Sequence, residues 1–595
     1  MCRIAGIIQP SIPVENLQQT VAEMCALLKH GGPDDEGIFT AANEHLVLGN
    51  RRLSLMDLSA SGHQPMQYEG RYTITYNGEL YNFTALKMLL QAEGMVFHNT
   101  SDTEVILAAF AKWNTQSFSK LNGMFAFALW DNEDKKLYLV RDGAGIKPLY
   151  YSTYTGGVVF ASEIRGFKPV DYLQERNKDA AVYQLAYGFI PEPITVLTHV
   201  KPLPKGCYFM YDCLTKNTSL QSFSFFSFSN SITSEKEAKQ KILASMQDAV
   251  SRQMLADENV GIFLSGGTDS AILAKLANNA EKKKLHTISI YFEEENYSEK
   301  KYQDLIAKEI NSTHHSILLK EADFHRDFSA VIAAMDMPSC DGINTWFISK
   351  FAASVGLKAV LSGIGADELY GGYPSFNRMK NSLQLSKLPK ELLNLSAKLD
   401  LKKYNRIAYL RLQGINGLYL FLRGHFTPVQ IAAQLGSYEK DIWNVLEKTP
   451  VSASLTRVTT KNKASWMEFN IYMQDQLLRD ADVMSMSHGL EIRVPFLDNE
   501  VINTAFSITE KIKYKGKLPK QLLTETFEKE LPKAIWNRPK MGFSFPFNEW
   551  LKESPLVKDL AGSKNTATQK IVKDFMNNSL HWSRVMSLLV LGSQY

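Results

Sequence analysis

The amino-acid sequence predicts an α/β protein with two domains. Three observations carry this prediction. The chain has 595 residues, which is more than a single domain usually contains. Its first part is rich in short strand-like runs. From about residue 236, short apolar runs alternate with helical patterns, as in a parallel sheet covered by helices.

Residues 1–165 are expected to form sheets packed against helices. Two helices are predicted, at Val14–Leu28 and at Asp102–Trp113, where Thr100 or Ser101 can serve as the N-cap. β-Branched, aromatic and aliphatic residues gather in short runs that are typical of strands. These runs are Leu46–Leu48, Tyr72–Tyr76, Met124–Trp130, Leu137–Val140 and Val158–Ala161.

The pattern changes twice further along the chain. Residues 166–235 combine a proline-rich stretch with the low-complexity sequence SLQSFSFFSFSNSITS, which indicates a hairpin and a linker. The predicted helix Glu235–Gln253 then precedes three apolar strands, VGIFL, LHTISIYF and LKAVLSG, with the helices AILAKLANNA and Ser298–Ile310 between them. This order predicts a doubly wound parallel sheet. The remainder, residues 380–595, is mostly amphipathic helix.

The composition excludes several classes of protein. With 45% hydrophobic and 22% charged residues the chain is globular, and a net charge of +4 gives no basis for nucleic-acid binding. Five scattered cysteines without a CxxC spacing argue against a disulfide framework and a zinc site, and favour a reducing compartment. No apolar stretch approaches the roughly 18–20 residues of a membrane span. We therefore expect a cytoplasmic enzyme that binds neither nucleic acid nor a membrane.

The most specific motif is SGGTDS, between a predicted strand and a predicted helix. Gly266 and Gly267 let the backbone approach a ligand closely, and the helix start offers free N–H groups to a pyrophosphate. The hydroxyls of Ser265 and Ser270 add donors, and Asp269 is a candidate Mg²⁺ ligand. Taken alone, SGG is equally an ordinary turn. Its strand–loop–helix context predicts a nucleotide site, although no Walker sequence GxxxxGK[ST] occurs.

A second loop, SGIGADELYGGY, follows the third expected strand of the parallel sheet. Ligands bind at the carboxyl ends of parallel strands, which puts Ser362 and Gly363 at the same site. Asp367 is a second candidate Mg²⁺ ligand, although acidic residues are also common at helix starts without any ligand. SGGTDS resembles the PP-loop of ATP pyrophosphatases, which adenylate a substrate with ATP. This resemblance puts the adenine beside Leu264 and Ile290.

The chain begins MCRIAGIIQP. If Met1 is removed, Cys2 carries a thiol and a free α-amine with a pKa of about 7.7–8.0. That amine can take the thiol proton, as in other N-terminal nucleophiles. A cysteine at position 2 is by itself usually incidental, so its weight depends on the residues that accompany it.

Three motifs in the same strand-rich part suit a glutamine substrate: RRLSLMD, YNGELYN and SDTE. Arg52 suits the α-carboxylate, and Glu79 and Asp102 suit the α-ammonium. Asn77 and the N–H of Gly78 suit a tetrahedral oxyanion. Taken singly, the charged residues are more typical of a protein surface, and Asn-Gly is more typical of a hairpin turn.

Together with Cys2, these motifs resemble the glutaminase domain of class II amidotransferases, an N-terminal-nucleophile fold with layered α/β/β/α sheets. HGGPDDEG, GMFAFALWD and RDGAGIKPLYY are further matches. The resemblance implies that Cys2, Asn77 and Gly78 are catalytic. It implies that glutamine is bound by Arg52, Leu53, Ser54, Leu55, Met56, Asn77, Gly78, Glu79 and Asp102.

Over nearly its full length the chain is similar to glutamine-hydrolysing asparagine synthetases, which also share LLRDADVMSMSHGLEIRVPFLD and RPKMGFSFP. The last motif puts Lys540 near the α-phosphate of ATP. The resemblance implies a glutaminase domain at residues 2–210, a linker at 211–235 and an ATP pyrophosphatase domain at 236–595. It implies ammonia transfer to an acyl-adenylate made with ATP and Mg²⁺, foremost from aspartate, with release of AMP and pyrophosphate. A homodimer is expected by analogy alone.

Three positions depart from the family pattern. Gly31 stands where the family usually has the arginine of HRGPD, and Gly143 where it often has the second arginine of RDRxGxKP. Ile364 stands between the glycines of SGIGADE, where asparagine synthetases commonly have an acidic residue. Isoleucine neither accepts a proton nor binds an ammonium, so a different carboxylate acceptor, such as a sugar uronic acid, stays open. A non-catalytic homologue is a third reading, against which Cys2, SGGTDS and Lys540 argue.

Overall fold

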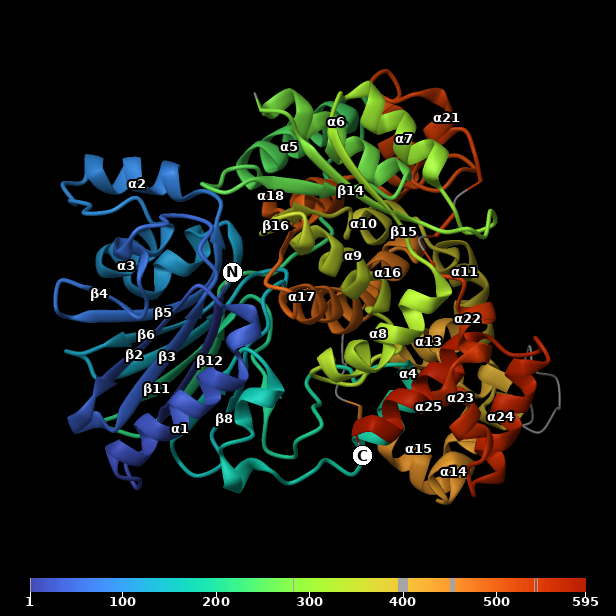
Figure 1. Ribbon diagram of the computed structural model, residues 1–595, viewed down its shortest axis with the longest axis horizontal. Helices are drawn as coiled ribbons and strands as arrows, with labels where there is room; N and C mark the ends of the chain where they lie inside the picture. Colours follow the sequence, from blue (N-terminus) through green and yellow to red (C-terminus); the bar gives the residue numbers. More distant parts are fainter. Residues whose placement is uncertain are drawn as a thin grey trace.

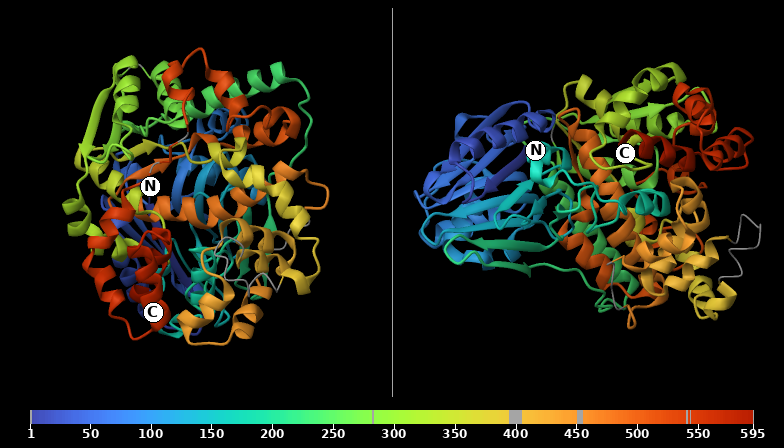
Figure 2. Two further views of the ribbon diagram at one scale, coloured as in Figure 1. Left: turned by 90° about the vertical axis from the view of Figure 1, so that its right-hand side faces the viewer. Right: turned by 90° about the horizontal axis from the view of Figure 1, so that it is seen from below.

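The computed structural model describes residues 2–281, 283–393, 405–449, 455–539, 541–542 and 544–594. Two α/β domains lie side by side, and the chain starts where they meet (Figure 1). The right-hand view of Figure 2 shows the same division from below, with a sandwich of sheets against a larger, mostly helical body. The predicted two-domain α/β class is confirmed.

The N-terminal domain is built on two six-stranded sheets, in the orders β10-β8-β9-β1-β3-β2 and β12-β11-β7-β6-β5-β4. The first consists of β1 (Cys2–Ile8), β2 (Asp35–Ala41), β3 (Leu46–Arg52), β8 (Tyr150–Ser152), β9 (Val158–Ala161) and β10 (Lys201–Pro202). The second consists of β4 (Met66–Tyr68), β5 (Tyr72–Leu80), β6 (Gly123–Asp131), β7 (Lys136–Arg141), β11 (Cys207–Asp212) and β12 (Thr218–Ser222).

The layers of this domain follow from where its apolar side chains point. Ile4 of the first sheet and Trp130 of the second belong to the core between the sheets. Helix α1 (Val14–Leu27) packs on the outer face of the first sheet. Helix α3 (Asp102–Trp113) packs on the outer face of the second, with α2 (Phe83–Ala92) beside it. The result is the expected α/β/β/α sandwich, in which β1 is an interior strand.

The C-terminal domain contains a five-stranded parallel sheet in the order β15-β14-β13-β16-β17. β13 (Val260–Phe263), β14 (His286–Tyr291) and β16 (Ala359–Leu361) are the three expected strands. β15 (Thr313–Leu318) and β17 (Glu491–Arg493) were not expected. β15 is a half-exposed edge strand with two histidines, and β17 comes from a segment more than a hundred residues after β16.

Helices cover this sheet and continue to the end of the chain (Figure 1). Those around the sheet are α5 (Glu235–Gln253), α6 (Thr268–Ala280), α7 (Lys300–Glu309), α8 (Glu321–Ala334), α9 (Ile343–Ser354), α10 (Ala366–Tyr370) and α11 (Pro374–Leu385). The later ones are α13 (Gly414–Arg423), α14 (Pro428–Leu435), α15 (Glu439–Glu447), α16 (Thr460–Met467), α17 (Arg479–Met486), α18 (Asn499–Ser507), α19 (Glu510–Lys513), α20 (Gln521–Phe527), α21 (Lys533–Trp536), α22 (Phe547–Glu553), α23 (Pro555–Ala561), α24 (Thr566–Met576) and α25 (Trp582–Gln594).

The two domains share one apolar cluster. Leu53 and Leu55 of the N-terminal domain belong to the same cluster as Ile492 of β17, and Ile364 packs against it. Helix α4 (Ala180–Tyr187) also leaves the sandwich and packs among α13, α14 and α15. Within the described ranges, no helix is both long and apolar enough to pass through a membrane.

Candidate functional site

A narrow pocket surrounds Cys2 at the start of β1. Antiparallel pairing of β1 with β3 puts Cys2 opposite Arg52, and β5 of the second sheet lies behind them. RRLSLMD, YNGELYN and SDTE, which are widely spaced in the sequence, are thereby brought together. The pocket is lined by Cys2, Arg52, Leu53, Leu55, Met56, Gly62, Gln64, Tyr76, Gly78, Glu79, Ser101, Asp102 and Thr103.

Cys2 is held from the side of β5. It is only 6% exposed, and burial raises the pKa of its thiol. Its backbone N–H donates to Asn77 Oδ1 at 3.2 Å. The buried Nδ2 of Asn77 has no hydrogen-bond partner among the described residues. Gly78 has a φ of +154°, and a Cβ there would lie 2.1 Å from the carbonyl oxygen of Met124, so only glycine fits.

Arg52 and Asp102 form part of the polar wall of the pocket. Arg52 Nη2 donates to the carbonyl oxygen of Met56 at 3.1 Å and so shapes the loop that follows β3. Asp102 accepts hydrogen bonds from the N–H of Leu80 at 2.8 Å and from the hydroxyl of Tyr76 at 3.1 Å. Both charged groups are therefore fixed by the backbone before any ligand arrives.

Glu79 connects this pocket to the other domain. Its Oε2 lies 3.4 Å from Nη2 of Arg493, and Arg493 Nε donates to Glu491 at 2.6 Å. Burial raises the pKa of Glu79, and the charge of Glu491 raises it further. Arg493 thus shares its positive charge between two buried glutamates, one of which lines the pocket.

Most of the predicted pocket residues line the pocket, and two do not. Asn77 accepts a hydrogen bond from Cys2 but does not line the pocket. Ser54 does not line the pocket either, and its N–H donates to Asp34 Oδ2 at 2.9 Å. Sequence reasoning missed Gly62, Gln64, Tyr76, Ser101 and Thr103. Strand alternation could have found Tyr76, because it lies on the same face of β5 as Gly78. Nothing in the sequence marks Gln64, which comes from a separate loop.

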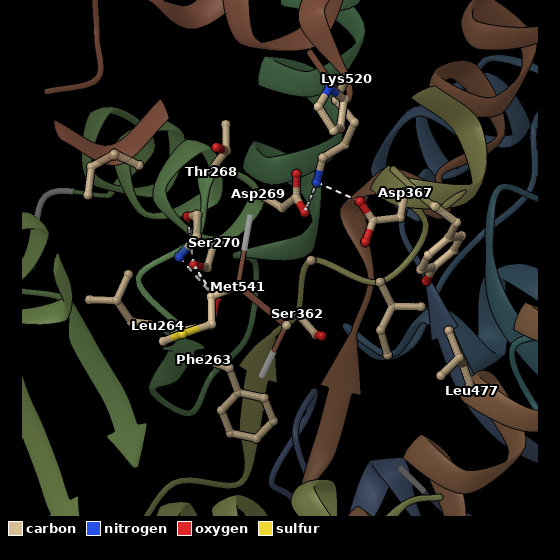
Figure 3. A pocket seen from close by; sticks show the side chains of 18 of the residues that line it. Phe263, Leu264, Thr268, Asp269, Ser270, Ser362, Asp367, Leu477, Lys520 and Met541 are labelled. Atoms are coloured by element: carbon tan, nitrogen blue, oxygen red, sulfur yellow. Dashed lines mark hydrogen bonds and ion pairs between the residues drawn. The ribbon is translucent and has the colours of Figure 1, made fainter. Parts of the chain in front are cut away.

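The second site is a cavity of about 630 Å³ at the carboxyl end of the parallel sheet. β13 runs into the SGGTDS loop, where Ser265 Oγ accepts the N–H of Gly267 at 3.3 Å and lies 3.0 Å from Ser270 Oγ. Gly266 has a left-handed φ of +84°, which turns the chain into α6. Figure 3 shows the loop and Ser362 around the cavity. Of the predicted nucleotide residues, the lining ones are Leu264, Ser265, Gly267, Asp269, Ser270, Ile290, Ser362 and Gly363.

Lys520 joins the two candidate metal ligands. Its Nζ donates to Asp269 and lies 2.7 Å from Asp367 Oδ1 (Figure 3). Burial opposes the charge of Lys520, but the two carboxylates more than offset this and raise its pKa. Both side chains reach one ammonium group, and carboxylate oxygens are the hard donors that Mg²⁺ prefers. Asp269 and Asp367 therefore fit Mg²⁺.

Other residues that line the cavity differ in character from the SGGTDS loop. Ile364 is one of them, as are Tyr373 and Tyr472. Two carboxylates, Asp341 and Asp480, also line the cavity, and burial raises the pKa of Asp480 to about 7. An apolar side chain thus stands where an acid is common in the family, and acidic groups lie on neighbouring elements instead.

Two further residues, Gly266 and Lys520, lie around the SGGTDS loop. Gly266 does not line the cavity, but its carbonyl oxygen accepts a hydrogen bond from Arg538 at 2.9 Å. Lys540 lies outside the described residues. Lys520 was missed, because the run KLPKQLL is indistinguishable in the sequence from a basic surface segment.

The structure explains two departures from the family pattern. A Cβ at Gly31 would lie 2.8 Å from Cγ of Arg3, whose side chain fills that space. A Cβ at Gly143 would lie 2.7 Å from Oγ of Ser224. Both glycines therefore stand where another segment of this chain occupies the room for a side chain.

A pocket around a buried thiol at the start of an α/β/β/α sandwich, beside a cavity at the SGGTDS loop of a parallel sheet, fits one class of protein: amidotransferases in which a glutamine domain is fused to a ligase domain. Comparison of the sequence with known protein families supports this class. Residues 1–224 match the glutamine amidotransferase domain model, and residues 241–584 match the asparagine synthase model. The chain belongs to the asparagine synthase family and is a ligase.

Similar proteins match almost the whole chain. Asparagine synthetase [glutamine-hydrolyzing] 1 of Bacillus subtilis is 32% identical over 573 residues, which are 93% of this chain and 88% of that protein. Asparagine synthetase [glutamine-hydrolyzing] 3 of the same species is 28% identical over 595 aligned positions, covering 94% and 91%. The residue ranges of the two family models include both sites.

Proposed function

We propose that the protein converts aspartate to asparagine, using glutamine as nitrogen donor and ATP as activator, and releases glutamate, AMP and pyrophosphate. The observation that supports this most is the presence of a buried thiol pocket and a phosphate-loop cavity in one packed chain. We assign the glutamine reaction to residues 2–210 and activation to residues 236–595, with 211–235 as linker. Five free cysteines suit the cytoplasm.

The glutamine reaction requires that Met1 has already been removed. The freed α-amine of Cys2 takes the thiol proton, and the sulfur attacks the amide carbon of glutamine. Charge then develops on the amide oxygen, and the unpartnered Nδ2 of Asn77 and the N–H of Gly78 are the donors placed to receive it. Ammonia leaves, a thioester remains, and water releases glutamate.

Selection of glutamine rests on three charges. Arg52 binds the α-carboxylate, and Glu79 and Asp102 bind the α-ammonium. The backbone of Leu53, Ser54, Leu55 and Met56 closes the pocket along the side chain of the substrate. Burial raises the pKa of Glu79, which favours its neutral form. The positive charge of a bound α-ammonium would favour the ionised form, so Glu79 and the ammonium stabilise each other's charge.

Activation takes place in the cavity. A carboxylate oxygen of the acceptor attacks the α-phosphorus of ATP, and pyrophosphate leaves on the SGGTDS loop, with the adenine beside Leu264 and Ile290. Lys520 and Lys540 offset negative charge on the phosphates. Mg²⁺, when bound by Asp269 and Asp367, would neutralise further phosphate charge. Ammonia then attacks the acyl carbon, and AMP leaves.

Ammonia passes between the sites inside the protein, because solvent would protonate it. β17 supports this route from both sides. Arg493 contacts Glu79 of the glutamine pocket, while its neighbour Ile492 lines the nucleotide cavity. The backbone carbonyl of Arg493 also accepts the N–H of Ser362 at 2.8 Å, so the strand touches the nucleotide loop directly.

A second candidate keeps this chemistry and changes the acceptor. It is favoured by Ile364, which lines the cavity and offers the acceptor no charge. The test is pyrophosphate release from Mg-ATP and glutamine in the presence of single carboxylic acids. Aspartate-dependent pyrophosphate and asparagine are expected. Release only with another acid, such as a uronic acid, would overturn aspartate. No release with any acid and no glutaminase activity would leave a non-catalytic homologue.

A further inference from the structure

Arg3 follows the proposed nucleophile directly and is fully buried between the two domains. Its Nε lies 2.6 Å from Glu163 Oε1 in the N-terminal domain. Its Nη2 lies 2.8 Å from Asp482 Oδ2 on α17 of the other domain. Lys147 Nζ donates to the second oxygen of Asp482 at 3.1 Å. Ion pairs this deep are held by geometry, since water cannot replace a lost partner.

Gly31 provides the space for this side chain. A Cβ at position 31 would lie 2.8 Å from Cγ and 2.9 Å from Nε of Arg3. Arg3 and Gly31 therefore form a matched pair: the arginine reaches across the interface only because position 31 has no side chain. Position 31 lacks the arginine of the family pattern HRGPD, and the guanidinium group of Arg3 is buried beside it instead.

The partner of Arg3 stands on a helix that bounds the nucleotide cavity. Asp480, two residues before Asp482, lines that cavity. Helix α17 also continues a π-helical segment, Glu468–Leu478, whose Tyr472 and Leu477 line the same cavity. The ion pair between Arg3 and Asp482 thus joins β1, which carries Cys2, to α17, which carries Asp480.

We propose, on the basis of the function proposed above, that Arg3 is a positioning residue that couples the two reactions. By fixing β1 against α17 it keeps the pocket around Cys2 aligned with the part of the cavity that Asp480 lines, where the acceptor would bind. Ammonia released at Cys2 then reaches the acyl-adenylate before it escapes to solvent. Arg3 lines neither the pocket nor the cavity, so each reaction alone proceeds without it.

The test is Arg3→Lys, which keeps a cation beside Glu163 but cannot reach both carboxylates at once. We expect asparagine formed per glutamate released to fall about tenfold, as small misalignments of reacting groups do. Glutaminase activity and synthesis from saturating ammonium chloride should stay within about twofold. An unchanged ratio, or an equal loss in all three assays, would overturn the proposal.

The matched control is Lys358→Met, which removes another ion pair between the domains, Lys358 with Asp34 at 3.1 Å. That pair touches neither β1 nor α17, and the ratio should not change.

A second measurement does not depend on the acceptor. Hydrogen exchange in the intact protein should speed up in Arg3→Lys for both β1 and α17, and for neither in Lys358→Met. If the wild type makes no asparagine, the proposed function has failed while exchange still tests Arg3. If β1 alone responds, Arg3 is a local contact of its strand and the proposal is wrong.

Discussion

Asn77 shows how one side chain can serve structure and chemistry together. Its Oδ1 accepts the N–H of Cys2, which leaves Nδ2 buried and without a partner among the described residues. A buried donor of this kind costs stability unless something uses it. Its place beside the thiol gives that cost a purpose in the proposed reaction, because the developing oxyanion would accept from it.

Single residues are also the features that the sequence predicts least completely. Most of the residues that the motifs predicted line the two sites, but many residues that line the nucleotide cavity were not predicted. Lys520 could not be predicted, because its partners Asp269 and Asp367 lie far away in the sequence and nothing near it indicates burial. Ser54 and Asn77 show the reverse: a motif marks them, but the course of the loop after β3 and the face of β5 decide whether each lines the pocket.

Lys520→Met should abolish activation and spare the glutamine reaction. Without the ammonium, Asp269 and Asp367 repel each other and the phosphates lose a positive partner. We expect ATP–pyrophosphate exchange to fall about 10²–10³-fold, with glutaminase activity unchanged. Lys517→Met, on the exposed part of the same segment, is the control. Exchange at the wild-type rate in Lys520→Met would show that the lysine is only structural.

Gly31→Ala should destabilise the protein because of Arg3. The added Cβ meets Cγ of Arg3, and such overpacking costs about 1–3 kcal/mol. In an Arg3→Ala background the same change should cost much less, since the space is empty. Thermal unfolding of the four proteins measures this coupling. Equal costs in both backgrounds would contradict it, and Gly562→Ala, where the nearest atom is 3.4 Å away, should be mild in both.

At the scale of elements, prediction succeeded where a periodic pattern is long or a strand is apolar. α5 and β9 have the predicted bounds, and Ser101 rather than Thr100 caps α3, with its Oγ accepting from Thr103. β15 and β17 were missed for physical reasons. β15 is a half-exposed edge strand with histidines, and β17 has three residues whose pairing depends on β16, distant in sequence.

Helix α19 ends with a buried lysine that gives a pH-dependent stability. Lys513 Nζ donates to the carbonyl oxygen of Ala505 at 2.9 Å, and burial lowers its pKa to about 7. In the unfolded chain a lysine has a pKa of about 10.4, so between these values the unfolded state binds more protons. Stability from this residue therefore rises with pH across that window.

The corresponding prediction concerns Lys513→Met. The melting temperature of the wild type, relative to that of the variant, should rise from pH 7 to pH 9.5, whichever protein is more stable at pH 7. Differential scanning fluorimetry at several pH values measures this. Lys511→Met, an exposed lysine of the same helix, should follow the wild type throughout. Parallel curves for wild type and Lys513→Met would mean that Lys513 is not titrating in this range.

At the scale of the whole molecule, the order of two domains was predictable because each carries its own motifs. Their interface was not. Arg3 with Asp482 and Glu79 with Arg493 join residues hundreds of positions apart, and each of these residues is unremarkable in its own sequence context. The shared apolar cluster likewise appears only once both domains are folded.

Cys2→Ala should separate the work of the two domains. Removal of the thiol takes away the nucleophile but leaves the pocket backbone and the nucleotide cavity intact. Glutamine-dependent synthesis should be lost, while synthesis from ammonium chloride should continue at close to the wild-type rate. Cys213→Ala, remote from both sites, should retain both activities. Glutamine-dependent turnover that survives in Cys2→Ala would falsify the assignment of the nucleophile.

The position of β17 late in the chain has a consequence for folding during synthesis on the ribosome. The sandwich is complete in sequence at Ser222, but Arg493, which contacts Glu79 and completes the parallel sheet, is synthesised later. At about 5–20 residues per second the interval is roughly 15–50 s. Until β17 is made, Glu79 lacks its arginine partner, and the N–H of Ser362, once synthesised, lacks the carbonyl oxygen of Arg493. The contacts that join the two domains through β17 therefore form only late in synthesis.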